Sequence, residues 1–265
     1  MKTPRQLRCV VGVVCGACWT LRAAGAGAAV PQSLYAGLDV AFHTVRDDTL
    51  VPLAFSGPRL ALMSRYFGEL GPGLLVGEGQ LGLGYALDRE QAQAATFSWG
   101  LQASYLFRVY EGDWQVALGP ALGWDNQTFL LLDWDDAHAY WIGTLWLGPG
   151  LRGWTWLNDD WRLDLAGEVA LLGWQSRPPE YRRHKQETSY ELLPYFTQPT
   201  RDLEFGGIAD WQVLRFSVEL FESPAPRRAP YGWGFGSELA WVHASDPRPA
   251  FGFSASLRVS YGFDL

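Results

Sequence analysis

The last 15 residues of the chain alternate strictly between apolar side chains and small or polar ones. Every odd position from Phe251 to Leu265 is apolar, whereas the even positions hold only Gly, Ser, Arg or Asp. Because side chains of a β-strand point to opposite faces with a period of two, this pattern predicts a strand. Ordinary strands have about five or six residues, so this one is predicted to be unusually long, with one fully apolar face.

The same alternation recurs in other parts of the chain. It is clearest at residues 34–44, 75–87, 97–109, 114–125 and 161–173. Strands of a β-sandwich also alternate, but they are shorter and carry Lys, Thr and Glu on the outer face. Long strands with lipid on the apolar side and a polar lumen on the other are typical of a transmembrane barrel. We therefore predict an all-β fold, an antiparallel transmembrane β-barrel.

Aromatic residues provide a second indication of such a barrel. On the predicted apolar faces Trp114 and Trp124 lie ten residues apart, as do Phe251 and Tyr261. Ten residues at about 3.3 Å each, tilted by about 40°, span roughly 25 Å, which is about the height of a barrel's apolar band. We therefore predict aromatic girdles at the two membrane interfaces. Their members are Trp114, Trp124, Trp161, Tyr231, Trp241, Phe251 and Tyr261.

The N-terminus has the pattern of an export signal. Basic residues at positions 2, 5 and 8 precede an apolar stretch from Cys9 to Trp19, and small residues follow at 23–29. The apolar stretch is too short to span a bilayer as a helix. This order predicts a cleaved signal peptide at residues 1–29 and a single barrel domain at residues 30–265. All three cysteines lie in the signal segment, which excludes cysteine chemistry from the mature chain unless the alternative, lipidation at Cys18, applies.

The last nine residues, from Leu257 to Leu265, resemble the terminal strand by which bacterial outer-membrane proteins are recognised for assembly. Leu265 stands where that strand usually ends in Phe or Trp. With the signal peptide, the resemblance to the outer-membrane β-barrel superfamily covers the whole chain. It implies a place in the outer membrane of a diderm bacterium, amid membrane lipid and surface glycolipid, with the barrel-assembly machinery as a partner. The net charge of −7 argues against a nucleic-acid partner.

Turns and links separate the alternating segments. The form Asp-Trp-polar-aliphatic occurs at Asp113, Asp160 and Asp210, and Asp favours tight turns while Trp favours the membrane interface. We predict periplasmic turns at the first two, and a bulge or a different placement at the third. Polar or Pro-rich links are predicted at 46–58, 126–138, 175–201 and 222–230. A plain count gives eleven strands, and because single-chain bacterial barrels have even numbers, we predict ten or twelve.

The polar faces of the predicted strands carry charges of both signs. The residues predicted to line the lumen are Asp39, His43, Glu78, Gln80, Gln102, Arg108, Asp125, Arg162, Asp164, Glu168, Arg215, Glu219, Glu238 and Arg258. In a narrow barrel such charges pair and fill the interior. The seven acids of this set outnumber its four arginines, so any open passage is predicted to prefer cations.

One local motif resembles a known catalytic arrangement. His243-Ala244-Ser245, near the external rim of a predicted apolar face, resembles the His-x-Ser of lipid A deacylases and outer-membrane phospholipases. The resemblance implies a Ser245 nucleophile that attacks an ester, with His243 as its base. Asp246-Pro247 replaces the Asn-Gly expected after the serine, and the next strand supplies no polar orienter. The alternative interpretation is that His243 is an interfacial histidine beside a turn and has no catalytic role.

Other acidic and histidine residues suggest chemistry on fewer grounds. Glu78 and Glu168 form either an acid–base pair or part of a structural network. His43 with Asp39 supplies only two of the ligands that a metal site needs. An acidic cluster with the composition of a calcium site consists of Asp133, Asp135 and Asp136. No metal site and no cofactor is predicted.

Three functions remain open. The first is a narrow pore or a transporter of small molecules or hydrophobic ligands, favoured by the polar lumen. The second is a non-enzymatic surface or adhesion barrel that presents loops, and the third is a lipid hydrolase that uses His243 and Ser245. The longest link carries a basic cluster that either binds phosphates of surface glycolipid or is simply solvated. This cluster consists of Arg177, Arg182, Arg183, His184 and Lys185.

Overall fold

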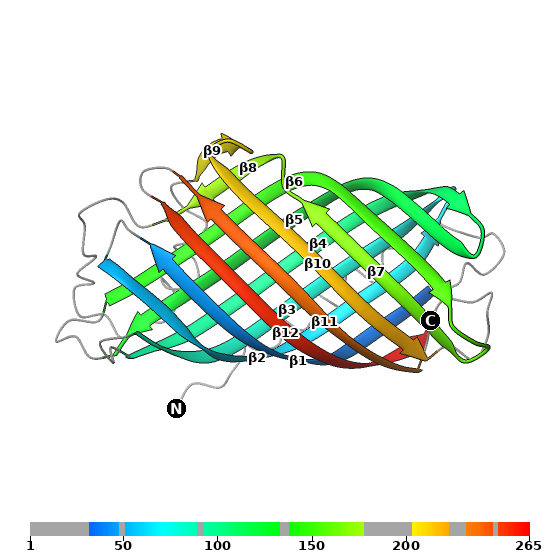
Figure 1. Ribbon diagram of the computed structural model, residues 1–265, viewed down its shortest axis with the longest axis horizontal. Helices are drawn as coiled ribbons and strands as arrows, with labels where there is room; N and C mark the ends of the chain where they lie inside the picture. The colour runs from blue at the N-terminus through cyan, green and yellow to red at the C-terminus, as the bar shows by residue number, and fades with distance from the viewer. Residues whose placement is uncertain are drawn as a thin grey trace, which may run out of the picture. The chain divides into compact units, whose positions relative to one another are not determined.

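The computed structural model describes residues 32–47, 51–88, 93–132, 138–177, 203–222, 232–245 and 249–265. Ten of their strands close into one antiparallel barrel, and two short strands lie outside the ring (Figure 1). The predicted all-β barrel is thus confirmed, with ten strands in the ring. The predicted signal peptide with Cys18, the acidic cluster at 133–136, girdle residue Tyr231 and the basic cluster beyond Arg177 lie outside the described residues. No helix of the described part is long and apolar enough to cross a membrane.

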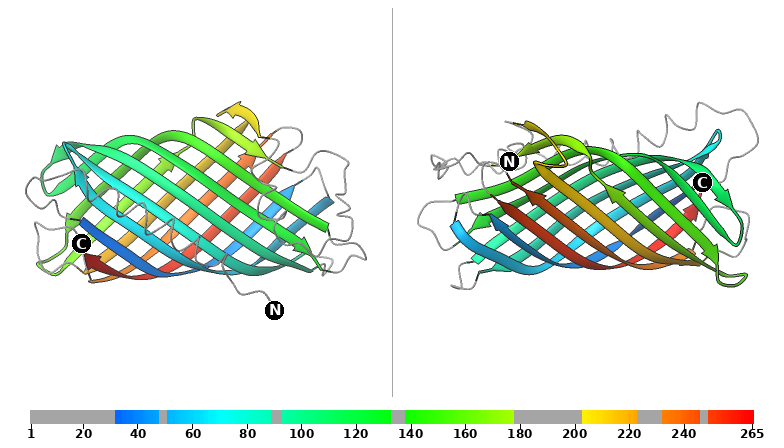
Figure 2. Two further views of the ribbon diagram at one scale, coloured as in Figure 1. Left: turned by 180° about the vertical axis from the view of Figure 1, so that it is seen from behind. Right: turned by 45° about the horizontal axis from the view of Figure 1, so that its top comes forward.

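Sequence neighbours pair along most of the ring. The strands are β1 (Gln32–Asp47), β2 (Val51–Leu70), β3 (Gly73–Leu87), β4 (Gln93–Glu111), β5 (Trp114–Leu131), β6 (His138–Trp156), β7 (Trp161–Val169), β8 (Leu172–Ser176), β9 (Glu204–Gly207), β10 (Trp211–Glu222), β11 (Gly232–Ala244) and β12 (Ala250–Asp264). The ring runs from β1 to β7, continues with β10, β11 and β12, and closes by pairing β12 with β1. All the strands are inclined to the barrel axis (Figures 1 and 2).

The two ends of the barrel differ. The amide of Leu265 donates a hydrogen bond to the carbonyl of Gln32 at 3.1 Å, so the first and last described residues meet at one end. The tight turns at 71–72, 112–113 and 157–160 lie at the same end, which we call the turn end. Gly71 has a φ of 58° there, a conformation that glycine adopts without steric cost. We call the opposite end the loop end.

Side chains alternate between the outer and inner faces of the wall. On β12, Leu257 is 71 % exposed, whereas its neighbour Arg258 is 4 % exposed. On β10 the inward row passes through three environments from the loop end to the turn end. Trp211 and Val213 pack in an apolar cluster, Arg215 and Glu219 form ion pairs, and Phe221 packs among aromatic side chains.

These environments define three layers inside the barrel. The loop-end layer contains two apolar clusters, Ala121, Trp146, Ala170, Trp211, Val213, Ala244 and Ala250, and Val45, Ala86, Ala94, Phe129 and Tyr140. The turn-end layer contains Tyr35, Phe67, Val76 and Phe221 together with Leu106, Ala117 and Trp154. The charged layer, described below, lies between them. Apolar side chains therefore cover the ion pairs from both ends of the lumen.

Three predictions about element bounds are corrected. The predicted link at 46–58 is wrong, because β1 extends to Asp47 and β2 begins at Val51. The predicted link at 126–138 overlaps both β5 and β6. The predicted strand at 161–173 is broken after β7, where Leu171 and Leu172 are both exposed and the alternation therefore slips by one residue. Both faces of β2 and β6 are rich in apolar residues, which removes the contrast on which the alternation depends.

Candidate functional site

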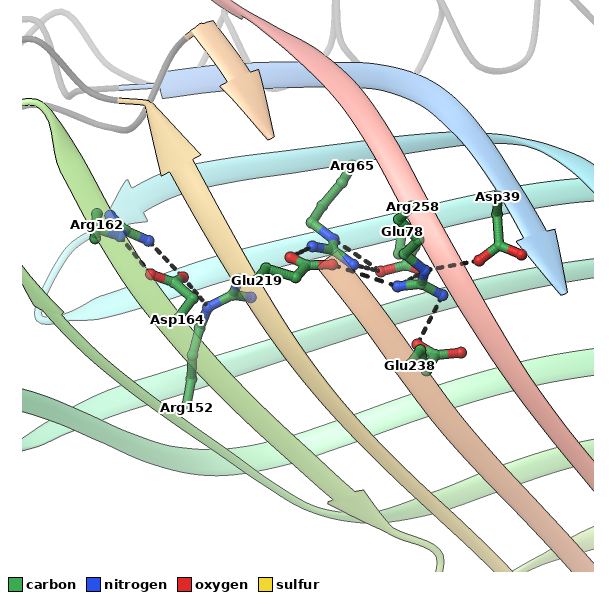
Figure 3. A network of polar contacts seen from close by, with 9 residues as sticks. All are labelled: Asp39, Arg65, Glu78, Arg152, Arg162, Asp164, Glu219, Glu238 and Arg258. Atoms are coloured by element: carbon green, nitrogen blue, oxygen red, sulfur yellow. Dashed lines mark hydrogen bonds and ion pairs between the residues drawn. The ribbon is translucent and has the colours of Figure 1, made fainter. Parts of the chain in front are cut away.

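The middle of the barrel is filled by paired charges, shown in part in Figure 3. We call them the charged layer. Its members are the carboxylates Asp39, Glu78, Asp125, Asp164, Glu168, Glu219 and Glu238 and the arginines Arg59, Arg65, Arg152, Arg162, Arg215 and Arg258. They come from nine of the ten ring strands, and the tenth, β4, contributes Gln102. The layer thus links the whole circumference of the barrel.

Arg258 of β12 is the centre of this layer. Its Nε donates a hydrogen bond to Asp39 Oδ2 at 2.8 Å, and its Nη2 lies 2.7 Å from Glu238 Oε2. Its Nη1 lies 3.3 Å from Glu78 Oε1 and 3.6 Å from Glu219 Oε1. One buried guanidinium therefore compensates carboxylates on four other strands, in the bidentate and multidentate manner that arginine's planar fork allows.

Several of these contacts cross the lumen. Arg65 of β2 pairs with Glu219 of β10 and also lies 2.6 Å from Glu78. Arg215 of β10 lies 2.6 Å from Asp125 of β5. The partner strands β2 and β10, and β5 and β10, are not neighbours in the ring. These side chains therefore extend across the barrel axis and block the lumen.

The charged layer is joined to the turn-end layer by cation–π contacts. Asp164 accepts hydrogen bonds from Arg152 at 2.9 Å and from Arg162 at 2.5 Å. The Arg152 guanidinium carbon lies 4.4 Å from the centroid of the Phe67 ring, and that of Arg162 lies 6.0 Å from the Phe221 ring. Arginine stacked on an aromatic face is favourable when both are withdrawn from water, so the two layers stabilise each other.

Sequence reasoning missed three of the six arginines of the charged layer. Arg59 and Arg65 lie on β2 and Arg152 lies on β6, the two strands that the alternation did not resolve. The predicted Arg108 lies at the turn-end mouth, where it is 36 % exposed and pairs with Glu69. The acidic excess of the predicted set, seven to four, therefore falls to seven to six within the charged layer. This reduces the basis for a cation preference.

Two small cavities lie against the charged layer. The first, of about 40 Å³, lies toward the turn-end layer and is bordered by Val76, Leu106 and Glu168. The second, of about 90 Å³, lies toward the loop-end layer. Arg215 and Glu238 line both cavities. These two side chains therefore form part of the partition between the two halves of the lumen.

The larger cavity is lined by charged and by apolar side chains. The charged ones are Arg59, Arg215, Asp125 and Glu238, and the apolar ones include Ile142 and Val242. Among the described residues, Arg59 Nε, Arg215 Nε and Gln127 Nε2 are buried without a hydrogen-bond partner. A buried donor without a partner is costly, so each of these three groups would be stabilised by an oxygen acceptor. We call this cavity the loop-side cavity.

The outer face of the barrel is apolar over the whole ring. Large hydrophobic side chains there are about half exposed, among them Val40, Leu83, Leu101, Leu151, Leu214, Leu239 and Leu257. The girdle residues Trp114, Phe251 and Tyr261 are 37 %, 40 % and 42 % exposed, while Trp124 packs edge-on against Trp99 at 5.0 Å. Only lipid suits a closed wall with polar groups inside and such an exterior. The fold is that of a transmembrane β-barrel.

The chain is similar to several solved structures. The barrel is similar to an outer-membrane channel from Pseudomonas putida, with 10 % identity, a TM-score of 0.41 and coverage of 89 % of this chain and 97 % of that chain. It is also similar to the translocator domain of the autotransporter NalP from Neisseria meningitidis (9 %, 0.42, 96 % and 97 %). A third is the toluene transporter TbuX from Ralstonia pickettii (9 %, 0.35, 90 % and 90 %). No family model and no curated protein matches the sequence.

The barrel does not assemble the hydrolase arrangement from its described residues. Ser245 follows β11, and its hydroxyl donates a hydrogen bond to the carbonyl of Asp210 at 2.8 Å. The His243 ring lies on the outer face with its centroid 6.3 Å from that of Trp241. Within the described part of the chain no hydrogen bond joins His243 and Ser245. The general-base contact that would activate a serine is therefore missing.

The remaining predicted lumen residues have separate environments in the barrel. His43 is 1 % exposed, packs edge-on against Phe129 at 5.9 Å, and has no partner for either ring nitrogen among the described residues. Gln80 lines the loop-side cavity. Glu168 accepts a hydrogen bond from Gln102 at 3.0 Å, whereas Glu78 is held by arginines, so the two do not share a proton site. No group of three or more possible metal ligands occurs in the described chain.

Proposed function

We propose that the protein transports small amphipathic acids across the outer membrane by binding them in the loop-side cavity. The observation that carries this proposal is the mixed lining of that cavity. Arg59 and Arg215, each with an unpartnered Nε, line it together with Ile142 and Val242, which pack against the apolar clusters of the loop-end layer. A carboxylate with a small hydrocarbon or aromatic body matches both kinds of lining group.

Arg59 is the residue best suited to hold the carboxylate. Its Nη2 lies 3.8 Å from Asp39 Oδ1, and its Nη1 lies 3.5 Å from the hydroxyl of Ser98. Both contacts are long, and Asp39 already accepts a 2.8 Å hydrogen bond from Arg258. Arg59 is thus a buried cation with weak compensation. Charge-assisted, bidentate hydrogen bonds to a carboxylate are among the strongest that a guanidinium makes.

The size of the cavity limits the ligand. A volume of about 90 Å³ has room for roughly six water molecules at about 15 Å³ each. Benzoate or a short fatty acid is of that order, whereas a sugar or a peptide is too large. The charged layer below the cavity blocks diffusion along the axis, which supports transport by a bound ligand rather than flow through an open pore.

Calorimetric titration of benzoate into the purified barrel tests this function. We expect saturable binding by the wild type and at least tenfold weaker binding by Arg59→Gln, because a neutral amide cannot replace the charge-assisted pair. The fold should survive this change, because Asp39 keeps its hydrogen bond to Arg258. Arg108→Gln is the matched control, since Arg108 lies at the turn-end mouth and pairs only with Glu69 among the described residues.

The outcome also separates the alternatives. Porin-deficient cells that produce the protein should accumulate radiolabelled benzoate several times faster than cells with an empty vector. Absence of benzoate binding by the wild type, or equal affinity of Arg59→Gln, refutes the proposal. Either result favours a barrel that presents surface loops.

A further inference from the structure

The barrel wall is interrupted at one place near the loop end. The β7–β10 ladder runs without a break from the pair Trp161 and Glu222 to the pair Val169 and Leu214. One further backbone bond follows, from the Ala170 amide to the Val213 carbonyl at 2.9 Å. Beyond it, β8 pairs with β9, and the start of β10 pairs only with β11. We call this interruption the seam.

The pairing pattern around the seam shows how it arises. Leu172 of β8 pairs with Gly207 of β9, and residues 208–210 then turn before β10 begins at Trp211. Residues 208–212 therefore have no partner on β8, although Trp211 itself pairs with Ala244 of β11. In Figures 1 and 2, β8 and β9 stand out from the cylinder at this place. The two sides of the wall diverge here.

A tryptophan side chain fills the seam. Trp211 is 3 % exposed and lies beside glycines of both outlying strands. A Cβ atom on Gly173 of β8 would stand 2.5 Å from the indole, and one on Gly206 of β9 would stand 2.9 Å from it. Only glycine leaves room for the ring at these positions. The indole Nε1 has no hydrogen-bond partner among the described residues, so packing alone holds the ring.

The seam has apolar surfaces on both sides. Inside, Trp211 packs in the loop-end layer with Trp146, and Val242 of the loop-side cavity packs against the same cluster. Outside, Trp174 is 40 % exposed and Phe205 is 66 % exposed, and their rings meet at 5.3 Å. The Trp211 indole therefore separates the interior near the ligand cavity from the lipid-facing surface.

The charged layer makes the axial route unfavourable for a molecule with an apolar body. Arg215 is the second inward-facing residue after Trp211 on β10, and it forms an ion pair across the lumen with Asp125. Passing this point requires separating buried ion pairs without replacing them, which is costly. Displacing one indole from between two glycines breaks no hydrogen bond of that ring. The sideways route is therefore easier.

We propose that the seam is a lateral exit through which the bound amphipathic acid leaves for the outer leaflet, with Trp211 as its gate. This inference rests on the proposed function and names the route of its ligand. The carboxylate leaves Arg59 for the polar headgroup region, while the last rung, Ala170 with Val213, opens and the apolar body passes between the β8–β9 pair and β10. No covalent step is involved.

A disulfide across the last rung of the seam tests the exit. Ala170→Cys with Val213→Cys joins opposed residues, whose Cα atoms in an antiparallel pair lie about 4.5–5.5 Å apart, a distance that disulfides accept. Cys9, Cys15 and Cys18 are replaced by Ala in the same full-length chain. In porin-deficient cells, the oxidised variant should take up radiolabelled benzoate at least five times more slowly than the wild type. Dithiothreitol should restore the rate.

A matched disulfide and a gate variant complete the experiment. Ala166→Cys with Ser217→Cys joins an inward-facing pair of the same two strands within the unbroken ladder, and its oxidation should leave uptake unchanged. Trp211→Ala should raise uptake severalfold while benzoate affinity of the purified barrel stays within twofold. If the oxidised seam variant takes up benzoate at the wild-type rate, the exit is refuted and the proposed function stands. Absence of benzoate binding by the wild type refutes both.

Discussion

A single arginine holds together much of the lumen. Arg258 is buried, and its guanidinium lies between 2.7 and 3.6 Å from four carboxylates. Buried ion pairs contribute little net stability compared with apolar packing, but removing one partner leaves an uncompensated charge. Removing Arg258 would therefore cost more stability, by leaving carboxylates uncompensated, than its ion pairs contribute as a net gain.

Replacement of this residue should be strongly destabilising. We expect Arg258→Met to lower the free energy of unfolding by about 3–5 kcal/mol, because carboxylates remain buried without their cation. Urea titration of the barrel in lipid vesicles measures the change. Adding Glu238→Gln should recover part of it, since one excess charge is removed. Arg108→Gln, at a pair that is more than a third exposed, should change it by less than about 1 kcal/mol; equal losses for the two arginines would contradict the central role of Arg258.

Most of the lumen acids follow from alternation, but half of the arginines do not. Asp39, Glu78 and Asp164 lie on strands whose opposite faces are apolar, so their inward position can be deduced. Arg65 on β2 lies between Met63 and Phe67 on the inward row. Apolar side chains of β2 therefore point into the lumen as well as outward. With apolar residues on both faces the period of two disappears. Cross-lumen partners are not readable from sequence at all, because they depend on how the ring closes.

At the scale of the strand, the two faces of β12 have different surroundings, lipid on one side and the lumen on the other. Its odd positions face lipid. Its even positions face the lumen, where their side chains form ion pairs or pack against other side chains. A charge on the outer face must be buried in hydrocarbon, and the cost depends on its depth in the membrane. Leu257, opposite Val40 of β1, lies far from both ends of the strand, whereas Phe263 lies near the turn end.

Two substitutions on the same face of β12 should therefore differ. We expect Leu257→Arg to cost about 2–4 kcal/mol of folding free energy, and Phe263→Arg about 0–1 kcal/mol. Both replace an exposed apolar side chain, at 71 % and 51 % exposure, so packing losses are comparable. Folding equilibria in lipid vesicles provide the measurement. Similar costs at the two positions would show that Leu257 does not lie near mid-membrane.

Irregular elements were the least predictable part of the fold. The third Asp-Trp motif, at Asp210, was predicted to involve a bulge or a different placement, and it lies at the loop end beside the seam. The break between β7 and β8 was not predicted, since Leu171 and Leu172 are both apolar and alternation assigns only one of them to the outer face. Such breaks depend on tertiary packing, here on the fit of Trp211 against Gly173.

At the scale of the whole molecule, the three lumen layers fill the interior of the barrel. The predicted barrel fold follows mainly from periodicity, because the outer face of every strand must satisfy the same lipid. The sequence predicts ten or twelve strands, because a plain count gives eleven and single-chain bacterial barrels have even numbers. Ten strands form the ring, and β8 and β9 lie outside it. Whether the lumen is filled depends on side chains from all around the ring and required the structure.

Planar-bilayer recording should therefore show little or no conductance for the wild type. The double variant Asp125→Asn with Arg215→Ala should raise it, because Arg215 lines both cavities and the net charge of the lumen is unchanged. The variant with Glu69→Gln and Arg108→Gln removes an equal and opposite pair at the turn-end mouth and should conduct like the wild type. Large, steady currents from the wild type would contradict closure by the charged layer.

The pairing of the first strand with the last also constrains how the molecule forms. Asp39 and Arg258, opposed across β1 and β12, are separated by 219 positions in the chain. Contacts between residues so distant in sequence slow folding, because the intervening chain must be ordered before they are made. The cylinder cannot close until synthesis has delivered its final strand, and until then the free edges of β1 and of the growing sheet are open to wrong partners. Closure of the barrel is therefore a late step, in which the first strand to be synthesised, β1, pairs with the last, β12.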